Sequence, residues 1–184
     1  MDYMLTQPTG VESLVLSGPA LSVPRYMADV KGLLAALPKD VQDTIARHEA
    51  AGTTDSPEYQ QATQVFYKRH LSRLDPWPPK LEKTFADFGT EVYSTVQGPS
   101  EFTVTGWIKD YDRTSRLGEL HLPVLFTAGR YDKVTPAQAE YYAGLVSDGQ
   151  LTIFEQSAHM TMLDETDRYI DVVRTFLASV DHKR

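Results

Sequence analysis

The sequence lacks several features that would each point to a particular class of protein. Its 184 residues contain no cysteine, which excludes a disulfide framework, a zinc site built on thiolates and a cysteine nucleophile. It has no apolar run of the roughly 18 residues that a membrane-spanning helix needs. Basic clusters are scarce, and the net charge of −7 argues against binding to nucleic acid or to an anionic membrane. We therefore expect no nucleic-acid or membrane partner, and a reducing, cytoplasmic location suits the lack of cysteine.

Candidate metal ligands are also sparse. The stretch HEAAG, which begins at His48, has a single histidine where a helical zinc motif needs a second one a turn later. No other spacing of His, Asp and Glu suggests a metal site. We expect neither a metal nor a cofactor.

The composition itself is that of an ordinary globular protein, with 41% hydrophobic and 23% charged residues. The length suits one domain, or a domain with an insertion. The pattern of apolar residues divides the chain into three parts. Residues 1–23 hold the end of a helix and a buried strand, whose apolar run Leu14–Leu16 is followed by a Gly-Pro turn signal. Residues 24–112 are mostly helical, and residues 113–184 alternate between strands and helices.

The C-terminal part predicts a parallel sheet. It reads in order as the strand PVLFTAG from Pro123, a helix, the strand QLTIF from Gln150 and a final amphipathic helix. Strands and helices that alternate at this spacing are typical of parallel α/β architecture. Because only three strands are expected in the whole chain, one edge of the sheet should lie open and invite pairing with another copy.

Two proton-handling side chains follow consecutive predicted strands. Asp132 comes shortly after the strand that ends in Ala128-Gly129, and His159 lies between the last strand and the last helix. Loops at the carboxyl ends of parallel strands line one crevice, so we expect both side chains to face it. A carboxylate there can accept a hydrogen bond from histidine Nδ1, which fixes the tautomer and stabilises the imidazolium. The order, acid before histidine, is that of α/β-hydrolases, in which a serine comes first.

Four longer stretches carry a resemblance to one family. They are GRYDKVTP, FEQSAHMTMLDE, RLDPWP and GPSEFTVTGWIKDYDRTSRL. Together they resemble the prolyl aminopeptidase (proline iminopeptidase) family of α/β-hydrolases, over nearly the whole chain. The resemblance implies a partial α/β-hydrolase fold, made of the last parallel strands and helices, with residues 24–112 as an inserted all-helical cap. It also implies that Asp132 is the catalytic acid and His159 the catalytic histidine of a serine hydrolase, which releases an N-terminal proline or cleaves small esters or amides.

The resemblance also assigns residues to substrate binding. Glu101, in GPSEF, matches a cap glutamate that binds the free amino group of the substrate, and a desolvated ammonium does need a paired acceptor. Lys133 stands where the family often has a second carboxylate, and its charge would repel an ammonium. A neutral ester or amide, or a substrate with a carboxylate, would suit this pair better. Trp107, like Trp77, either lines an apolar pocket of the size of proline or simply packs.

The serine nucleophile is the part of this pattern that the sequence does not supply. No serine lies in a G-x-S-x-G motif, and the nearest approach, GPSEF around Ser100, lacks the second glycine and the strand-turn-helix setting. The stretch MDYMLTQPTGVESLVLSGP resembles the helix and strand that follow the nucleophile in the family, so we expect the motif to lie before Met1. Ser157 is expected to form a local hydrogen bond. We predict a small-peptide or ester hydrolase that is impaired because its serine is absent.

Two other functions stay open. The chain is alternatively a small esterase that has recruited another serine, such as Ser100, or a non-catalytic remnant that covers its open sheet edge by forming a homo-oligomer. For Asp132 and His159 taken singly, the ordinary alternatives are a helix cap and a surface residue. For Glu101 the alternative is an exposed loop residue.

Overall fold

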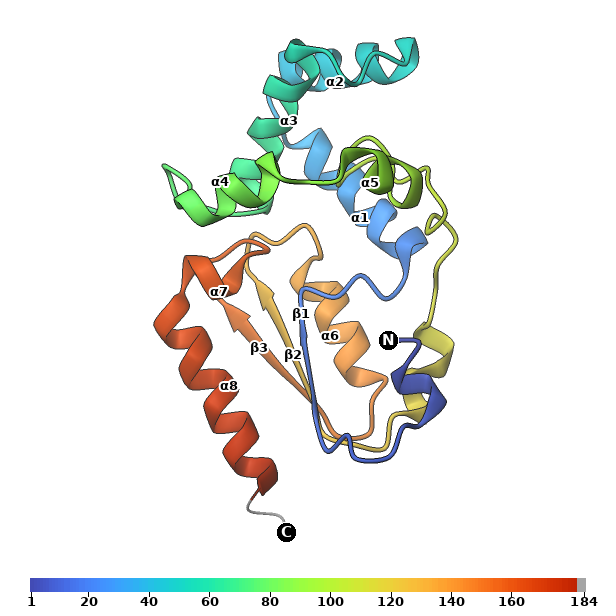
Figure 1. Cartoon of the computed structure of the whole chain (residues 1–184), viewed down its shortest axis with the longest axis vertical. Coiled ribbons are helices and arrows are strands. Elements are labelled where there is room, and N and C mark those ends of the chain that lie inside the picture. Colours follow the sequence, from blue (N-terminus) through green and yellow to red (C-terminus); the bar gives the residue numbers. More distant parts are fainter. Residues whose placement is uncertain (182–184) are drawn as a thin grey trace.

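Three parallel strands form a single sheet at the centre of the molecule (Figure 1). The computed structural model describes residues 1–181. The strands are β1 (Leu14–Ser17), β2 (Val124–Gly129) and β3 (Gly149–Phe154), in the spatial order β1-β2-β3. Their pairing runs from Leu14 opposite Val124 to Gly129 opposite Phe154. The prediction of a parallel α/β sheet is confirmed.

Two helices cover the two faces of this sheet. α6 (Pro136–Gly144) packs on one face and α8 (Thr166–Asp181) on the other (Figure 1). The side chains of β2 alternate between them: Phe126 belongs to the large core shared with α6, whereas Leu125 packs against Phe176 of α8. All six residues of β2 are buried, because both faces are covered, and this explains the unbroken apolar sequence of the strand.

β1 is an edge strand. It pairs with β2 on one side, and no other strand of the described chain lies on its other side. All four of its residues are half-buried. The sheet therefore has the open edge that three predicted strands imply.

Most of the helices lie between β1 and β2 in the sequence. They are α1 (Val23–Ala35), α2 (Lys39–Ala51), α3 (Pro57–His70), α4 (Pro79–Ala86) and α5 (Thr90–Val96). Figure 1 shows them gathered beyond the end of the sheet at which α7 (Thr161–Asp164) also lies, with α2 farthest away. Ser56 caps α3, and its hydroxyl accepts a hydrogen bond from the N–H of Tyr59 at 3.2 Å.

The helical segment and the sheet share one hydrophobic core. Tyr26 of α1 and Phe66 of α3 belong to the same cluster of buried side chains as Phe126 of β2. Two short 3₁₀ helices, Met4–Thr6 and Thr114–Glu119, complete the described chain. None of the helices within it combines the length and the apolar character needed to cross a membrane. The expected cytoplasmic location stays a prediction.

Candidate active site

Asp132 lies in the loop that follows β2, here termed the acid loop (residues 130–135). Its side chain is completely buried. The Oδ1 atom accepts two hydrogen bonds, from the N–H of Val134 at 2.8 Å and from Nδ1 of His159 at 3.0 Å. The next helix, α6, is capped by Thr135 instead. The carboxylate of Asp132 is therefore turned toward the histidine and is not a helix cap.

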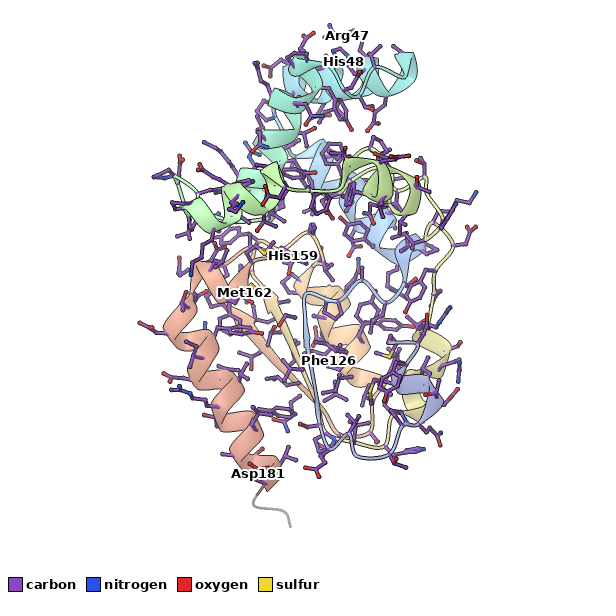
Figure 2. All side chains as sticks on the ribbon, viewed as in Figure 1. Arg47, His48, Phe126, His159, Met162 and Asp181 are labelled. Atoms are coloured by element: carbon purple, nitrogen blue, oxygen red, sulfur yellow. The ribbon has the colours of Figure 1, made fainter. Side chains whose placement is uncertain are left out.

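His159 lies in the loop that follows β3, here termed the histidine loop (residues 155–160). Figure 2 shows its side chain where the sheet meets the helices of the cap. Nδ1 donates to Asp132, while Nε2 forms no hydrogen bond with any residue in 1–181. The side chain is 22% exposed and lines a pocket. A histidine held at Nδ1 and open at Nε2 is arranged to take up a proton from a group in that pocket.

Gly18, directly after β1, packs against this pair and lines the same pocket. Its φ of +54° lies in the left-handed region that glycine adopts without strain. A Cβ atom at this position would lie 2.6 Å from Nδ1 of His159 and 3.0 Å from Oδ2 of Asp132. Only a residue without a side chain fits there. In the sequence Gly18 is visible only as part of a turn signal, because its close approach depends on three loops that meet in space.

The pocket in front of His159 has a volume of about 280 Å³. Its apolar wall includes Val23, Tyr26, Val104 and Ile108, and its charged groups are Glu101 and Lys133. Mostly apolar clefts with a few convergent polar groups are typical of sites for small molecules. No group of three or more His, Asp or Glu side chains in residues 1–181 is arranged to hold a metal ion.

Glu101 and Lys133 form an ion pair in the wall of this pocket, with Nζ of the lysine 2.5 Å from Oε2 of the glutamate. Their side chains are 23% and 6% exposed, so Glu101 is not a freely exposed loop residue. Burial opposes ionisation of Glu101, but the charge of Lys133 and the hydrogen bonds from Lys133 and Tyr93 outweigh it. The pKa of Glu101 therefore lies below its ordinary value of 4.5, and the carboxylate is ionised at neutral pH.

Two tyrosines that the sequence did not single out support this carboxylate. The hydroxyl of Tyr93 donates to Oε1 of Glu101 at 2.8 Å, and that of Tyr26 donates to the backbone carbonyl of Glu101 at 2.5 Å. Burial first, and then the charge of Glu101, raise the pKa of both phenols, so both remain hydrogen-bond donors. Aromatic residues on helices are usually core residues, and only the contact with Glu101 reveals this second role.

The two tryptophans lie outside the pocket, and the expectation that Trp107 lines it is wrong. Its side chain is 81% exposed. Its backbone N–H donates to the carbonyl of Thr95 in α5, and this pairing fixes a segment whose tryptophan side chain lies in solvent. Trp77 packs against Phe85 and donates to the carbonyl of Ser72 at 3.3 Å, which is a structural role.

No hydroxyl group in residues 1–181 forms a hydrogen bond with Nε2 of His159. Ser157 donates to Glu165 at 2.6 Å, which is the local hydrogen bond that the sequence predicts. Ser100 is completely buried, and its backbone forms a bridge with Thr103 instead of an elbow between a strand and a helix. Neither serine is placed to attack a substrate bound at His159.

Comparison with known proteins gives a consistent result. The model of the α/β-hydrolase fold family matches residues 2–166. The proline iminopeptidase of Heyndrickxia coagulans is 43% identical over 179 residues, which are 97% of this chain and 62% of that protein.

Two crystal structures are similar over nearly the whole chain. VinJ superposes with a TM-score of 0.93 at 35% identity, over 97% of this chain and 61% of that one. The proline iminopeptidase of Mycobacterium smegmatis superposes with a TM-score of 0.88 at 33% identity, over 99% of this chain and 62% of that one. The chain thus spans about three fifths of the length of the relatives that it matches.

Proposed function

This chain belongs to the α/β-hydrolase fold family, and from that premise we propose that it carries the acid and the histidine of a prolyl aminopeptidase-type serine hydrolase. The observation that supports this most directly is the 3.0 Å hydrogen bond between Asp132 and His159 at the edge of a pocket. The names of its homologues, proline iminopeptidases, point to the same reaction type.

The roles of the two residues follow from this geometry. In the complete site a serine hydroxyl attacks the carbonyl carbon of the substrate, and Nε2 of His159 takes the proton of that hydroxyl. The same nitrogen then returns the proton to the leaving amine or alcohol. Asp132 holds the Nδ1–H tautomer and stabilises the positive charge that forms on the ring. Water then releases the acyl group through the same two proton transfers.

We also propose that, although the relatives are named for the release of an N-terminal proline, this pocket prefers a substrate without a free ammonium group next to the scissile bond. Glu101 supplies the only carboxylate in the described wall of the pocket, and Lys133 already neutralises it at 2.5 Å. A second cation would have to displace the lysine or lie against it, and like charges this close repel strongly. A neutral ester or amide, or an acyl group with a carboxylate, fits this wall better than an N-terminal proline.

For the chain as given, we propose that no competent nucleophile is present and that its activity is strongly impaired. This is supported by the lack of a hydroxyl at Nε2 of His159 within residues 1–181 and by the absence of a G-x-S-x-G motif. Removing a member of a triad in serine proteases leaves only about 10³- to 10⁴-fold acceleration over water.

A fluorophosphonate probe tests this directly, because it reacts only with an activated serine. We expect no stoichiometric labelling of the purified chain when its intact mass is measured. A chain labelled in a 1:1 ratio, with the label mapped to Ser100 or another serine, would overturn the proposal. Hydrolysis of p-nitrophenyl acetate that is lost in both His159→Ala and Ser100→Ala would support the small-esterase alternative instead.

The open edge of β1 supports a second candidate, a non-catalytic role through self-association. The strand exposes one side of its backbone ladder, and a second copy of this chain is the occupant that we propose. Light scattering over a range of concentrations distinguishes the cases. A well-folded monomer at all concentrations would rule out this candidate.

A further inference from the structure

The segment that leaves α3 contacts both catalytic loops at once. We call it the cap joint (residues 70–73). The carbonyl oxygen of His70 accepts hydrogen bonds from the N–H groups of Lys133 at 3.3 Å and His159 at 3.4 Å. The next carbonyl along the chain accepts one from Met160 at 2.8 Å. One short piece of cap backbone therefore bridges the acid loop and the histidine loop.

A carboxylate strengthens the link to the histidine loop. Asp164, the last residue of α7, accepts hydrogen bonds from the hydroxyl of Ser72 at 2.7 Å and from the N–H of Arg73 at 3.2 Å. Its Oδ2 atom also accepts the N–H of Ala158 at 2.8 Å. Hydrogen bonds to an ionised acceptor are stronger than neutral ones. A single side chain therefore holds both the cap joint and the peptide group just before His159.

The acid loop is held in a matching way. Nδ1 of His70 donates to the carbonyl of Tyr131 at 2.9 Å, and the ring of His70 packs on Phe66 of the cap core. The guanidinium of Arg73 stacks over the ring of Tyr131 at 3.8 Å. Tyr131 directly precedes Asp132, just as Ala158 precedes His159. His70 and Arg73 thus contact the acid loop, and Asp164 contacts the histidine loop, each one residue before the proton-handling group.

We propose that Asp164 and His70 are positioning residues, which set the geometry of the Asp132–His159 hydrogen bond from the cap side. The two loops are also joined directly, by the hydrogen bond from the N–H of Tyr131 to the carbonyl of Ser157 at 3.0 Å, and the contacts of His70 and Asp164 add to this link. Proton transfer tolerates displacements of only about 0.5 Å. The role in catalysis rests on the proposed function. The hydrogen bond itself exists without substrate or nucleophile and can be measured on the chain as it stands.

The experiment observes the Nδ1 proton of His159 by NMR, assigned by its loss in His159→Gln. In Asp164→Ala we expect this proton to exchange with water about tenfold faster, because a charged acceptor with several hydrogen bonds is removed. Ser72→Ala removes only the bond on the cap side, and we expect an increase of about threefold. In His70→Ala we expect an increase in the exchange rate between these two values. Asp164→Asn, which keeps the size and one acceptor oxygen, should restore part of the protection.

Asp87→Asn is the matched control. It removes a carboxylate of the helical segment that forms an exposed ion pair with Lys83, and it should leave the exchange rate unchanged. Circular dichroism reports whether each variant is folded. If Asp164→Ala does not fold, the exchange rates of the Nδ1 proton of His159 in Ser72→Ala and Asp164→Asn test the proposal instead. Folded variants at residues 72 and 164 that exchange like the parent chain would overturn the proposal. The exchange rate does not depend on the outcome of fluorophosphonate labelling, so the two experiments can contradict the two proposals independently.

Discussion

The two walls of the pocket each hold one pair of a carboxylate and a basic group, and consecutive residues contribute to both. On the core wall, Asp132 holds His159. On the cap wall, Lys133 holds Glu101. The pairs differ in what they leave free: Nε2 of the histidine has no partner among the described residues, whereas both oxygens of the glutamate are occupied, by Lys133 and Tyr93. One wall is arranged to exchange a proton, and the other is arranged to stay ionised.

This difference shows how a single turn can serve two purposes. Successive side chains of the acid loop bond to different partners, Asp132 to His159 and Lys133 to Glu101. If the proposed function holds, substitutions at these neighbouring positions should change proton transfer and substrate binding separately. The following predictions test this separation, beginning with the largest expected effect.

Glu101→Ala should lower the free energy of unfolding by about 3 kcal/mol, because it leaves the buried ammonium of Lys133 without a partner. Denaturant titration measures it. The double variant Glu101→Gln with Lys133→Met should recover most of the loss, since an apolar side chain of similar size replaces a buried ion pair at little cost. As a control, Lys83→Ala removes an exposed pair and should change stability by less than about 1 kcal/mol. A single variant at Glu101 that behaves like this control would contradict a desolvated cap wall.

Gly18→Ala should lower the free energy of unfolding by about 2 kcal/mol, through backbone strain at positive φ and through contact with the imidazole. It should also abolish the protected Nδ1 proton of His159. Gly32→Ala provides the contrast, because this residue lies exposed in α1 with open space around it. There, alanine should stabilise the protein by about 0.5–1 kcal/mol. If both variants are equally stable, the core wall is not as tight as the contacts of Gly18 imply.

His70 of the cap joint and Glu101 of the cap wall should respond to acid in different pH ranges. Burial lowers the pKa of His70 below its ordinary value of 6.5, and the nearby charges of Arg69 and Arg73 lower it further, against opposing effects of Tyr131 and Asp132. As the pH falls below 6.5, the unfolded chain binds a proton that folded His70 does not, so stability is lost with falling pH.

Glu101 affects the stability of the protein at lower pH than His70 does. Its stabilisation is fully present above its ordinary pKa of 4.5 and is lost as the pH falls through the depressed folded-state pKa. His70→Gln should therefore flatten the stability profile just below pH 6.5 and leave the part below 4.5 intact. Unfolding titrations at several pH values check this, and a profile that is unchanged by His70→Gln would contradict it.

Trp107→Ala should have the smallest effect, within about 0.5 kcal/mol, because the ring is 81% exposed. Neither the Nδ1 proton of His159 nor the binding of a small neutral amide to the pocket, followed by NMR titration, should change. A clear loss of binding in this variant would show that Trp107 does contact molecules bound in the pocket.

The core could be read from the sequence because its signals are local. The apolar runs of β1 and β2 each reflect the conformation of their own segment. Asp132 and His159 come together because loops at the ends of parallel strands share one edge of the sheet. The general rule about topology was therefore enough to pair them.

The cap wall could not be read in this way. The contacts of Glu101 with Tyr93 and Tyr26 join segments whose relative position depends on how five helices pack, and no periodicity encodes that packing. The outward placement of Trp107 depends on the backbone pairing of its segment with α5, a seven-residue helix too short to give a clear pattern. The hydrogen bond from His70 to the carbonyl of Tyr131 could not be predicted either, because a histidine at the end of a helix usually lies at the surface.

The bare backbone at position 18 also limits how this site could be rebuilt by protein engineering. A hydroxyl introduced there would need a carbon atom inside the space that the imidazole fills, so position 18 itself cannot carry an added nucleophile. A serine grafted into this scaffold has to stand on another residue that borders the pocket and has to reach Nε2 of His159.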